Sequence, residues 1–203
     1  MAGSSFGKSF VVTTFGESHG VALGAIVDGV PAGIELSEED IQKFLDRRKP
    51  GQSSITTSRN ENDKCRIYSG VFGGKTTGTP IMVMLENQSQ RSQDYDELAI
   101  TYRPGHADFS FDSKFGFRDY RGGGRSSGRE TIGRVIGGAI AIKALEMLGI
   151  KVQAFTQSIG NVYAQSLNLD ECSENAVYMP DKDAAVRAIE LIKEAKSDKD
   201  SLG

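Results

Sequence analysis

Two histidines, one in each of two short segments that also carry glycine, are the residues best suited to proton chemistry. His19 lies in Gly16-Glu17-Ser18-His19-Gly20, and His106 follows Arg103-Pro104-Gly105. Histidine exchanges a proton most easily near neutral pH, so His19 and His106 are the candidate proton-transfer groups. A lone histidine is more often a packed core residue, but a ring on a glycine-bounded turn can face a cavity. Asp108, two residues after His106, either orients its ring or caps a turn.

Ser18 directly precedes His19 in the sequence. Neighbouring side chains in an extended chain point to opposite sides, so we do not expect Ser18 and His19 to act as a nucleophile and its base. No third group of a catalytic triad is identifiable from the sequence either.

A third segment, residues 121–131, is rich in glycine, arginine and serine. Glycines 122–124 let a ligand approach the backbone, and free amides after Ser126 and Ser127, at the start of a helix, favour negative charge. The segment therefore predicts a site for a phosphate or carboxylate. It is not a Walker A loop, which requires lysine, and no strand precedes it as in a Rossmann loop. An RGG-type RNA-binding segment is the alternative, which nearby acidic residues and the helix that follows disfavour.

The composition is that of a globular protein with a sizeable core. The net charge of −3 over 203 residues gives no general attraction to nucleic acid or to anionic membranes. The sequence has neither an apolar run of bilayer length nor a secretion signal, so we expect a cytoplasmic protein that binds neither nucleic acid nor membrane. Cys65 and Cys172 have no CxxC partner, which predicts reduced structural thiols and no metal site.

Two predicted strands, 9–14 and 21–27, flank the turn that carries His19. Ser37, with Asp40 three residues later, predicts a capped helix that Pro50-Gly51 ends, and Leu36 and Ile41 are spaced for a hydrophobic staple. The apolar face of this helix continues to Arg48. Arg48 is thereby aimed along the core face, although it can equally cover apolar surface.

Further along the chain, segments 71–75 and 80–86 predict a hairpin, and 103–128 a long irregular binding loop. Ser127 and Glu130 form a second capping box, which predicts an apolar, buried helix to about Leu148, closed by Gly149. Small residues recur every four positions on this helix and allow another backbone to approach: they are Gly133, Gly137 and Ala141. The last predicted elements are a strand over 152–159 and a helix over 183–196, with inward residues Val186, Ile189 and Ile192.

Residues 16–33 and 124–131 resemble the two N-terminal signatures of the chorismate synthase family. They read Gly-Glu-Ser-His-Gly-Val-Ala-Leu-Gly-Ala-Ile-Val-Asp-Gly-Val-Pro-Ala-Gly and Gly-Arg-Ser-Ser-Gly-Arg-Glu-Thr. Residues 46–51, 76–80 and 103–108 are also similar to characteristic segments of the family, in the same order. The resemblance covers nearly the whole chain to about Gly160.

The resemblance implies a shikimate-pathway lyase that converts 5-enolpyruvylshikimate 3-phosphate to chorismate by 1,4-anti elimination of phosphate. The family uses reduced FMN without net redox change, and NADPH enters only if the enzyme reduces its own flavin. The implied fold is α+β, a β-α-β sandwich with helices between antiparallel sheets, assembled as a homotetramer.

The resemblance also assigns roles to single residues. His19 resembles the family histidine near the departing phosphate, and His106 the one that protonates the reduced flavin. Three arginines resemble substrate-binding positions: Arg48, Arg103 and Arg129. Three further residues match positions that contact FMN: Arg125, Ser126 and Ser127.

The sequence departs from the family pattern at two positions and in length. Ser54 stands where some members have arginine, and Gly128 where alanine is commoner. Family members are longer, and their C-terminal half supplies further flavin contacts. We therefore expect residues 1–203 to be one chorismate synthase-like domain, truncated at its C-terminus. The alternative function is that of a catalytically inactive homologue that retains an anion-binding site.

Overall fold

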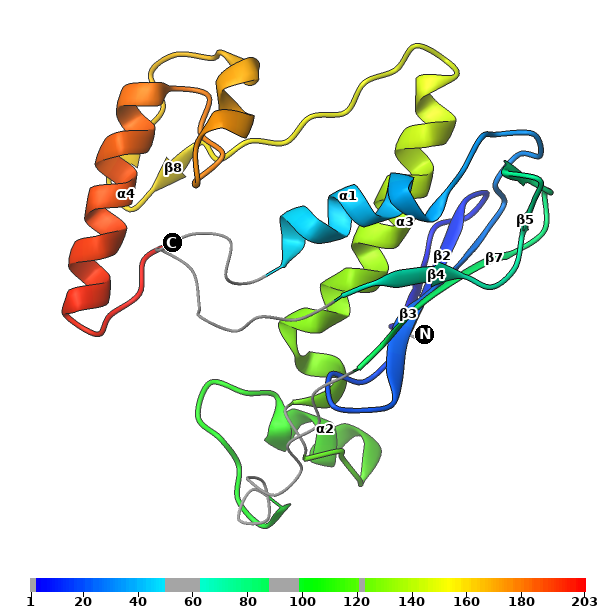
Figure 1. Ribbon diagram of the computed structural model, residues 1–203. Helices are drawn as coiled ribbons and strands as arrows, with labels where there is room; N and C mark the ends of the chain where they lie inside the picture. The colour runs from blue at the N-terminus through cyan, green and yellow to red at the C-terminus, as the bar shows by residue number, and fades with distance from the viewer. Residues whose placement is uncertain (1–2, 50–62, 88–98, 121–122) are drawn as a thin grey trace. The chain divides into compact units, whose positions relative to one another are not determined.

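The computed structural model describes residues 3–49, 63–87, 99–120 and 123–203. They form two compact units, one within Met1–Lys49 and Glu61–Ile150 and the other within Lys151–Gly203. Figure 1 shows the first unit as a sheet with two helices against it. That the whole chain is one domain stays a prediction.

An antiparallel five-stranded sheet is the frame of the first unit. Its strands lie in the order β1-β2-β3-β7-β4. Their bounds are Ser5–Phe6 for β1, Val11–Gly16 for β2, Ala22–Asp28 for β3, Ile81–Glu86 for β7 and Cys65–Ile67 for β4. Because side chains alternate along a strand, one face of the sheet is apolar and buried. The two strands predicted to flank His19 are confirmed as β2 and β3, each shifted by one or two residues.

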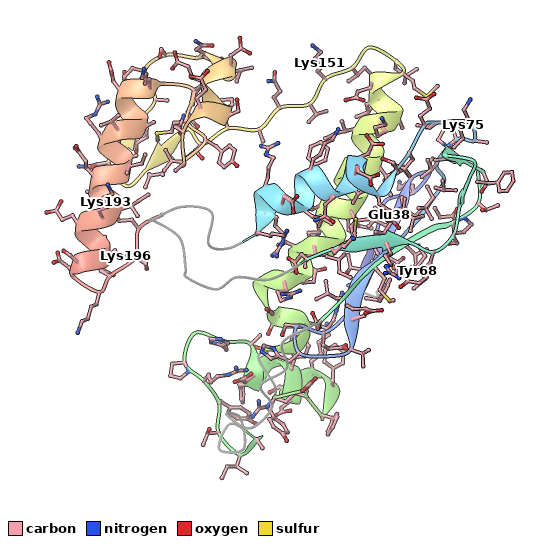
Figure 2. The ribbon with its side chains drawn as sticks, viewed as in Figure 1. Glu38, Tyr68, Lys75, Lys151, Lys193 and Lys196 are labelled. Carbon is pink, nitrogen blue, oxygen red and sulfur yellow. The ribbon has the colours of Figure 1, made fainter. Side chains whose placement is uncertain are left out.

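Helix α1, Glu38–Arg48, begins as the sequence predicts. The Ser37 side chain accepts from the amide of Asp40, and the Asp40 carboxylate accepts from that of Ser37, which confirms the capping box. The staple residues Leu36 and Ile41 are both buried in the core. The Glu38 carboxylate accepts from the backbone N–H of Ile67 at 2.9 Å, which ties α1 to β4 (Figure 2).

Helix α3, Thr131–Glu146, packs on the sheet through its glycines. A Cβ at Gly133 would lie 2.6 Å from Cγ2 of Thr14, and one at Gly137 would lie 2.7 Å from Cγ2 of Val12. The predicted close approach is therefore confirmed, and β2 is the neighbour. Gly149 has a left-handed φ of 70° and closes the helix as predicted. Burial, however, is confined to the face toward the sheet and α1, and Gly138 on the opposite face is exposed.

The second predicted capping box is wrong. Ser127 accepts from the amide of Arg129, and a short 3-10 turn, η4 at Gly128–Glu130, precedes α3. The Glu130 carboxylate instead binds the Thr14 hydroxyl at 2.8 Å and Nε of Arg134 at 3.0 Å. The Glu130 carboxylate is therefore bound by Thr14 of β2 and Arg134 of α3, and it does not cap the helix.

The predicted hairpin of 71–75 with 80–86 is wrong as well. Strand β5, Val71–Phe72, pairs with β6, Lys75–Thr76. Gly73 and Gly74 between them both have positive φ, which suits a two-residue hairpin turn. Strand β7 pairs with β3 and β4 instead, because its alternate residues belong to the central core.

The expected irregular loop 103–128 contains a helix that the sequence analysis missed. Helix α2, Asp108–Phe115, ends at Gly116, whose φ of 72° makes a left-handed cap. Its apolar residues are spread around the helix, so no amphipathic stripe marked it. The 3-10 turn η3, Gly124–Ser126, follows.

The second unit contains α4, Lys182–Ser197, capped by the side chain of Asp181. The predicted helix is confirmed, but Val186 is 52% exposed, so its predicted inward position is wrong; Ile189 and Ile192 pack against the buried alanines 184, 185 and 188. Only the end of the predicted strand over 152–159 forms: β8, Ser158–Ile159, pairs with β9, Val162–Tyr163. A 3-10 turn, η5, covers Leu169–Glu174.

The expected α+β class is confirmed, with helices packed on an antiparallel sheet. Within the described ranges, no helix is long and apolar enough to cross a bilayer.

Candidate functional site

The turn between β2 and β3 brings Ser18 and His19 together. The Ser18 hydroxyl lies 3.0 Å from Nδ1 of His19. The expectation that their side chains point apart is wrong, because the backbone turns here, with the amide of Gly20 bonded to the carbonyl of Glu17 at 3.1 Å. The ring of His19 is half-buried and Ser18 is buried.

Asn87, just after β7, fixes this turn and was missed by the sequence analysis. Its side-chain amide donates to the carbonyls of Glu17 at 3.1 Å and Gly20 at 2.7 Å. The amide of Asn87 donates to the carbonyl of Val21 at 3.0 Å. No sequence signal marks an asparagine for this role, because the partners of its side chain are backbone groups 67 and 70 residues away.

Both histidine-bearing segments meet the glycines at the start of η3. The amide of Ser18 lies 3.4 Å from the carbonyl of Gly124. A Cβ at Gly123 would lie 3.9 Å from Cδ2 of His106, whose ring is exposed. Gly123 and Gly124, with φ of 86° and 51°, thus contact the segments that carry the two predicted catalytic histidines. Three segments that are distant in the sequence form one site.

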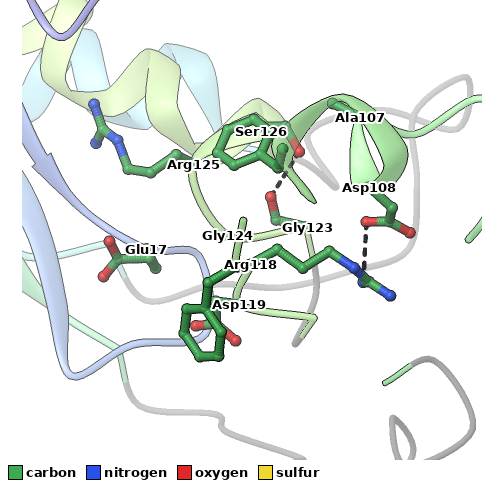
Figure 3. Close-up of a pocket in the computed structure, with 11 residues that line it drawn as sticks. Glu17, Ala107, Asp108, Arg118, Asp119, Gly123, Gly124, Arg125 and Ser126 are labelled. Atoms are coloured by element: carbon green, nitrogen blue, oxygen red, sulfur yellow. Dashed lines mark hydrogen bonds and ion pairs between the residues drawn. The ribbon is translucent and has the colours of Figure 1, made fainter. Parts of the chain in front are cut away.

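A pocket of about 140 Å³ lies beside these glycines. Figure 3 shows its lining, to which the His19 turn, α2 and η3 all contribute. Residues of both charges line it, among them Glu17, Asp108, Arg118, Asp119 and Arg125, together with the hydroxyl-bearing Ser126. The Ser126 hydroxyl donates to the carbonyl of Gly123 at 2.7 Å. The pocket can therefore offer both charged groups and hydrogen-bond donors to a small polar ligand.

Asp108 binds arginines and does not orient His106. It accepts from Nε and Nη2 of Arg103 at 2.9 and 2.8 Å, and Nη1 of Arg118 lies 3.5 Å away. The hydrogen bonds from Arg103 hold the pKa of Asp108 well below its usual range. His106 instead has its Nδ1 at 3.4 Å from the carbonyl of Pro104. Asp108 therefore acts on the loop that carries His106, not on its ring.

Arg48 and Arg129, two of the predicted substrate-binding arginines, converge on Asp63. Nη2 of Arg48 lies 2.6 Å from one carboxylate oxygen of Asp63, and Nη2 of Arg129 lies 2.8 Å from the other. Asp63 is buried, and it could not be predicted from the sequence, because a single aspartate outside the recognised motifs carries no signal. The third predicted arginine, Arg103, pairs with Asp108 instead.

Arg125 is turned toward the sheet. Its guanidinium donates to the carbonyl of Gly16 at 3.0 Å and to the hydroxyl of Thr14 at 2.6 Å, and it lies 3.6 Å from Glu130. Figure 3 shows its side chain extending away from Gly123 and Asp108. In this conformation Arg125 ties η3 to β2.

The amides expected to be free near Ser126 and Ser127 are largely bonded. Those of Ser126 and Ser127 lie 2.9 and 3.4 Å from the carbonyls of Gly123 and Gly124, and that of Glu130 lies 3.0 Å from the carbonyl of Ser127. The short 3-10 turns close these bonds where an α-helix would have left donors open. For these amides the expectation is wrong. Residues 121 and 122 of the predicted anion-binding segment, and Ser54, lie outside the described residues.

The two cysteines take no part in this site. Both are buried and neither is in a disulfide. Burial raises the pKa of the Cys65 thiol to about 11, which keeps it protonated and unreactive near neutral pH.

Comparison with known proteins places the chain among close relatives. A family model described as chorismate synthase matches residues 10–203. The chain is 62% identical over 205 residues to a chorismate synthase of Agathobacter rectalis and 57% identical to one of Lachnospira eligens. All of the chain is covered in both, but only 56% of each relative, so the chain spans about half the length of the curated relatives it matches. A solved structure entitled Crystal Structure of Chorismate Synthase matches with a TM-score of 0.72 and 30% identity, covering 95% of this chain and 55% of the other.

Proposed function

The chain belongs to the chorismate synthase family, and we propose that it provides the N-terminal part of a lyase that forms chorismate from 5-enolpyruvylshikimate 3-phosphate. The elimination removes phosphate and a proton from the substrate ring and leaves a new carbon–carbon double bond. Such a reaction needs cations to bind the substrate's phosphate and carboxylates, and groups that hold or move a proton.

The meeting of both histidine segments at Gly123 and Gly124 is the observation that carries this proposal. In it, His19 stands near the departing phosphate and donates a proton or hydrogen bond as negative charge develops. The Ser18 hydroxyl, at 3.0 Å from Nδ1, helps to orient the ring of His19. His106, on the exposed loop, is the second proton-transfer group.

Arg48 and Arg129 are the proposed cations for the substrate's anionic groups. They come from the end of α1 and from η4, and their side chains are each 14% exposed. Guanidinium groups suit this task because their planar donors match phosphate and carboxylate oxygens. Arg103, in contrast, must share its donors with Asp108, so we propose that it binds substrate while it remains paired.

The described residues by themselves do not fit a complete FMN. Pockets that enclose a cofactor measure roughly 300 to 1,000 Å³, whereas this one measures about 140 Å³. The donors of Arg125 are engaged by β2, and the amides at Ser126 and Ser127 are bonded. We propose that reduced FMN, the cofactor implied by the family, contacts Ser126, Ser127 and Arg125 only when further segments complete the site.

The remaining features of the proposal follow from family membership. We propose a cytoplasmic homotetramer whose small-molecule partner is the phosphorylated enolpyruvyl substrate. A requirement for NADPH is proposed only for an enzyme that reduces its own flavin.

A comparison of two proteins tests the proposed function. One is the 203-residue chain. The other is a full-length chimera in which residues 1–203 replace the matching part of the Agathobacter rectalis relative. Chorismate formation is measured with the phosphorylated substrate and chemically reduced FMN. We expect turnover by the chimera and little or none by the short chain. An inactive chimera would contradict the proposal and favour the alternative, an inactive homologue that binds anions.

A further inference from the structure

We infer that Asp63 is a positioning residue, which holds Arg48 and Arg129 in the arrangement that an anionic substrate requires. The inference rests on the proposed function, which gives these two arginines to the substrate. Nothing in the sequence motifs singles out Asp63.

Asp63 joins three separate parts of the first unit. It lies just before β4, whereas Arg48 ends α1 and Arg129 belongs to η4, immediately before α3. Each carboxylate oxygen accepts from a different arginine, at 2.6 and 2.8 Å. One carboxylate thereby fixes the separation of two guanidinium groups that come from elements 80 residues apart in the sequence.

Asp63 is itself held in place. The side-chain amide of Gln42 donates to the carbonyl of Asp63 at 2.8 Å. The side-chain oxygen of Gln42 accepts from the backbone amide of Cys65 at 2.9 Å. The side chain of Asp63 is only 2% exposed. A carboxylate so deeply buried has lost its hydration, and only its cationic partners stabilise its charge. The positions of the carboxylate and of the two guanidinium groups therefore depend on one another.

Preorganisation explains why such a group would serve binding. A free arginine side chain has many rotamers, and ordering it when a ligand arrives weakens binding. Asp63 fixes both arginines beforehand, and 14% of each arginine side chain stays exposed.

The sign of the effect separates positioning from simple charge competition. Asp63→Asn keeps the size of the side chain but removes its negative charge and one acceptor. If Asp63 merely competed with the substrate as an anion, Asp63→Asn would tighten anion binding. If Asp63 positions the arginines, binding weakens although a negative charge has been removed.

The test measures KM and kcat for the substrate in the full-length chimera, and binding of inorganic phosphate by calorimetry at low and high salt. We expect Asp63→Asn to raise KM about 10-fold or more, since misplacement of a binding group by about 1 Å can cost up to 10²-fold. Phosphate binding should weaken in parallel. Asp183→Asn is the matched control, because it removes the same charge at an exposed side chain of the second unit, and it should leave both quantities unchanged.

Double substitution tests whether Asp63 acts through its partners. Arg129→Ala should raise KM, and adding Asp63→Asn should raise it little further, because a residue that acts through another is not additive with it. Asp63→Glu, which keeps the charge but displaces the oxygens, should also raise KM and serves if Asp63→Asn does not fold.

An unchanged or lower KM in folded Asp63→Asn, with Arg129→Ala impaired, would overturn this inference alone. A chimera that forms no chorismate would refute the proposed function instead. Phosphate binding by Asp63→Asn would then still decide the positioning role, with weaker binding supporting it and equal or tighter binding opposing it.

Discussion

Arg103 and Asp108 form a two-point ion pair that closes the loop carrying His106. Two guanidinium nitrogens of Arg103 lie 2.9 and 2.8 Å from the two carboxylate oxygens of Asp108, and the Arg103 amide donates to one of them at 3.0 Å. The amide of His106 lies 3.3 Å from the carbonyl of Arg103. His106 is exposed, but the pairing of Arg103 with Asp108 fixes both ends of the loop that carries it.

Asp108→Asn should destabilise the first unit. Its side chain is 4% exposed, and the substitution leaves Arg103 and Arg118 without their shared carboxylate. Breaking such a buried pair from one side costs about 3 kcal/mol of unfolding free energy. Urea denaturation measures the loss. Asp46→Asn is the control, because it removes an exposed pair that contributes about 1 kcal/mol or less. Equal effects of the two substitutions would contradict this view of the ion pair.

The contribution of Asp108 should depend on pH in acid only. Arg103 lowers the pKa of Asp108 in the folded protein, whereas the unfolded value is about 3.9. The folded state therefore binds fewer protons, and the stabilisation is complete above about pH 5 and is lost as the pH falls toward the folded pKa. Unfolding free energies of the protein and of Asp108→Asn, measured from pH 3 to 7, should differ by a constant amount above pH 5. The difference should shrink below pH 4; a difference that grew in acid would reverse the assigned sign.

Gly133→Ala and Gly138→Ala should have opposite effects on stability. The added methyl group at Gly133 would lie 2.6 Å from Cγ2 of Thr14 and 2.9 Å from the carbonyl of Gly24, so α3 and the sheet must separate. Overpacking of this kind costs about 1 to 3 kcal/mol. Gly138 has nothing within 4 Å, so alanine there should stabilise the helix by up to about 1 kcal/mol. Thermal unfolding of both variants checks the pair, and destabilisation by Gly138→Ala would point to an unrecognised neighbour.

His19→Ala and His106→Ala, made in the full-length chimera, should each lower turnover by about 10²-fold, as expected for proton-transfer groups. Neither ring is buried, so both variants should unfold near the temperature of the unchanged protein. Turnover and thermal unfolding are measured together. A large loss of stability with turnover intact would identify them as packing residues.

Arg125→Ala should lower stability as well as cofactor affinity. Its guanidinium donates to Gly16, Thr14 and Ser4, and these acceptors lose a charged donor. Hydrogen bonds of this type contribute about 1.5 to 3 kcal/mol. Calorimetry with FMN at low and high salt, beside urea denaturation, separates the roles. Weak, salt-sensitive binding that disappears in Arg125→Ala without loss of stability would mean that the side chain turns from β2 to the ligand.

Features that depend on near neighbours in the chain could be predicted from the sequence alone. The Ser37–Asp40 capping box, the strands on either side of His19 and the Gly149 helix end each require only a few consecutive residues, whose backbone preferences are local. The small residues of α3 predicted the close approach of another backbone, because their spacing places them on one face of a helix. Family membership likewise came from continuous segments, such as residues 16–33.

Which partner each charged side chain binds became known only from the folded chain. Asp63 carries no local signal, yet it holds Arg48 and Arg129, and Arg125 and Glu130 are bound to β2 from more than 100 residues away. The pairing of β7 with β3 and β4 also follows from burial of its apolar face, which no turn sequence specifies. From the sequence alone, a charged residue or a strand could pair with any of several partners. Folding selects among them, because a buried donor, acceptor or apolar face must find a partner in the space that the whole chain encloses.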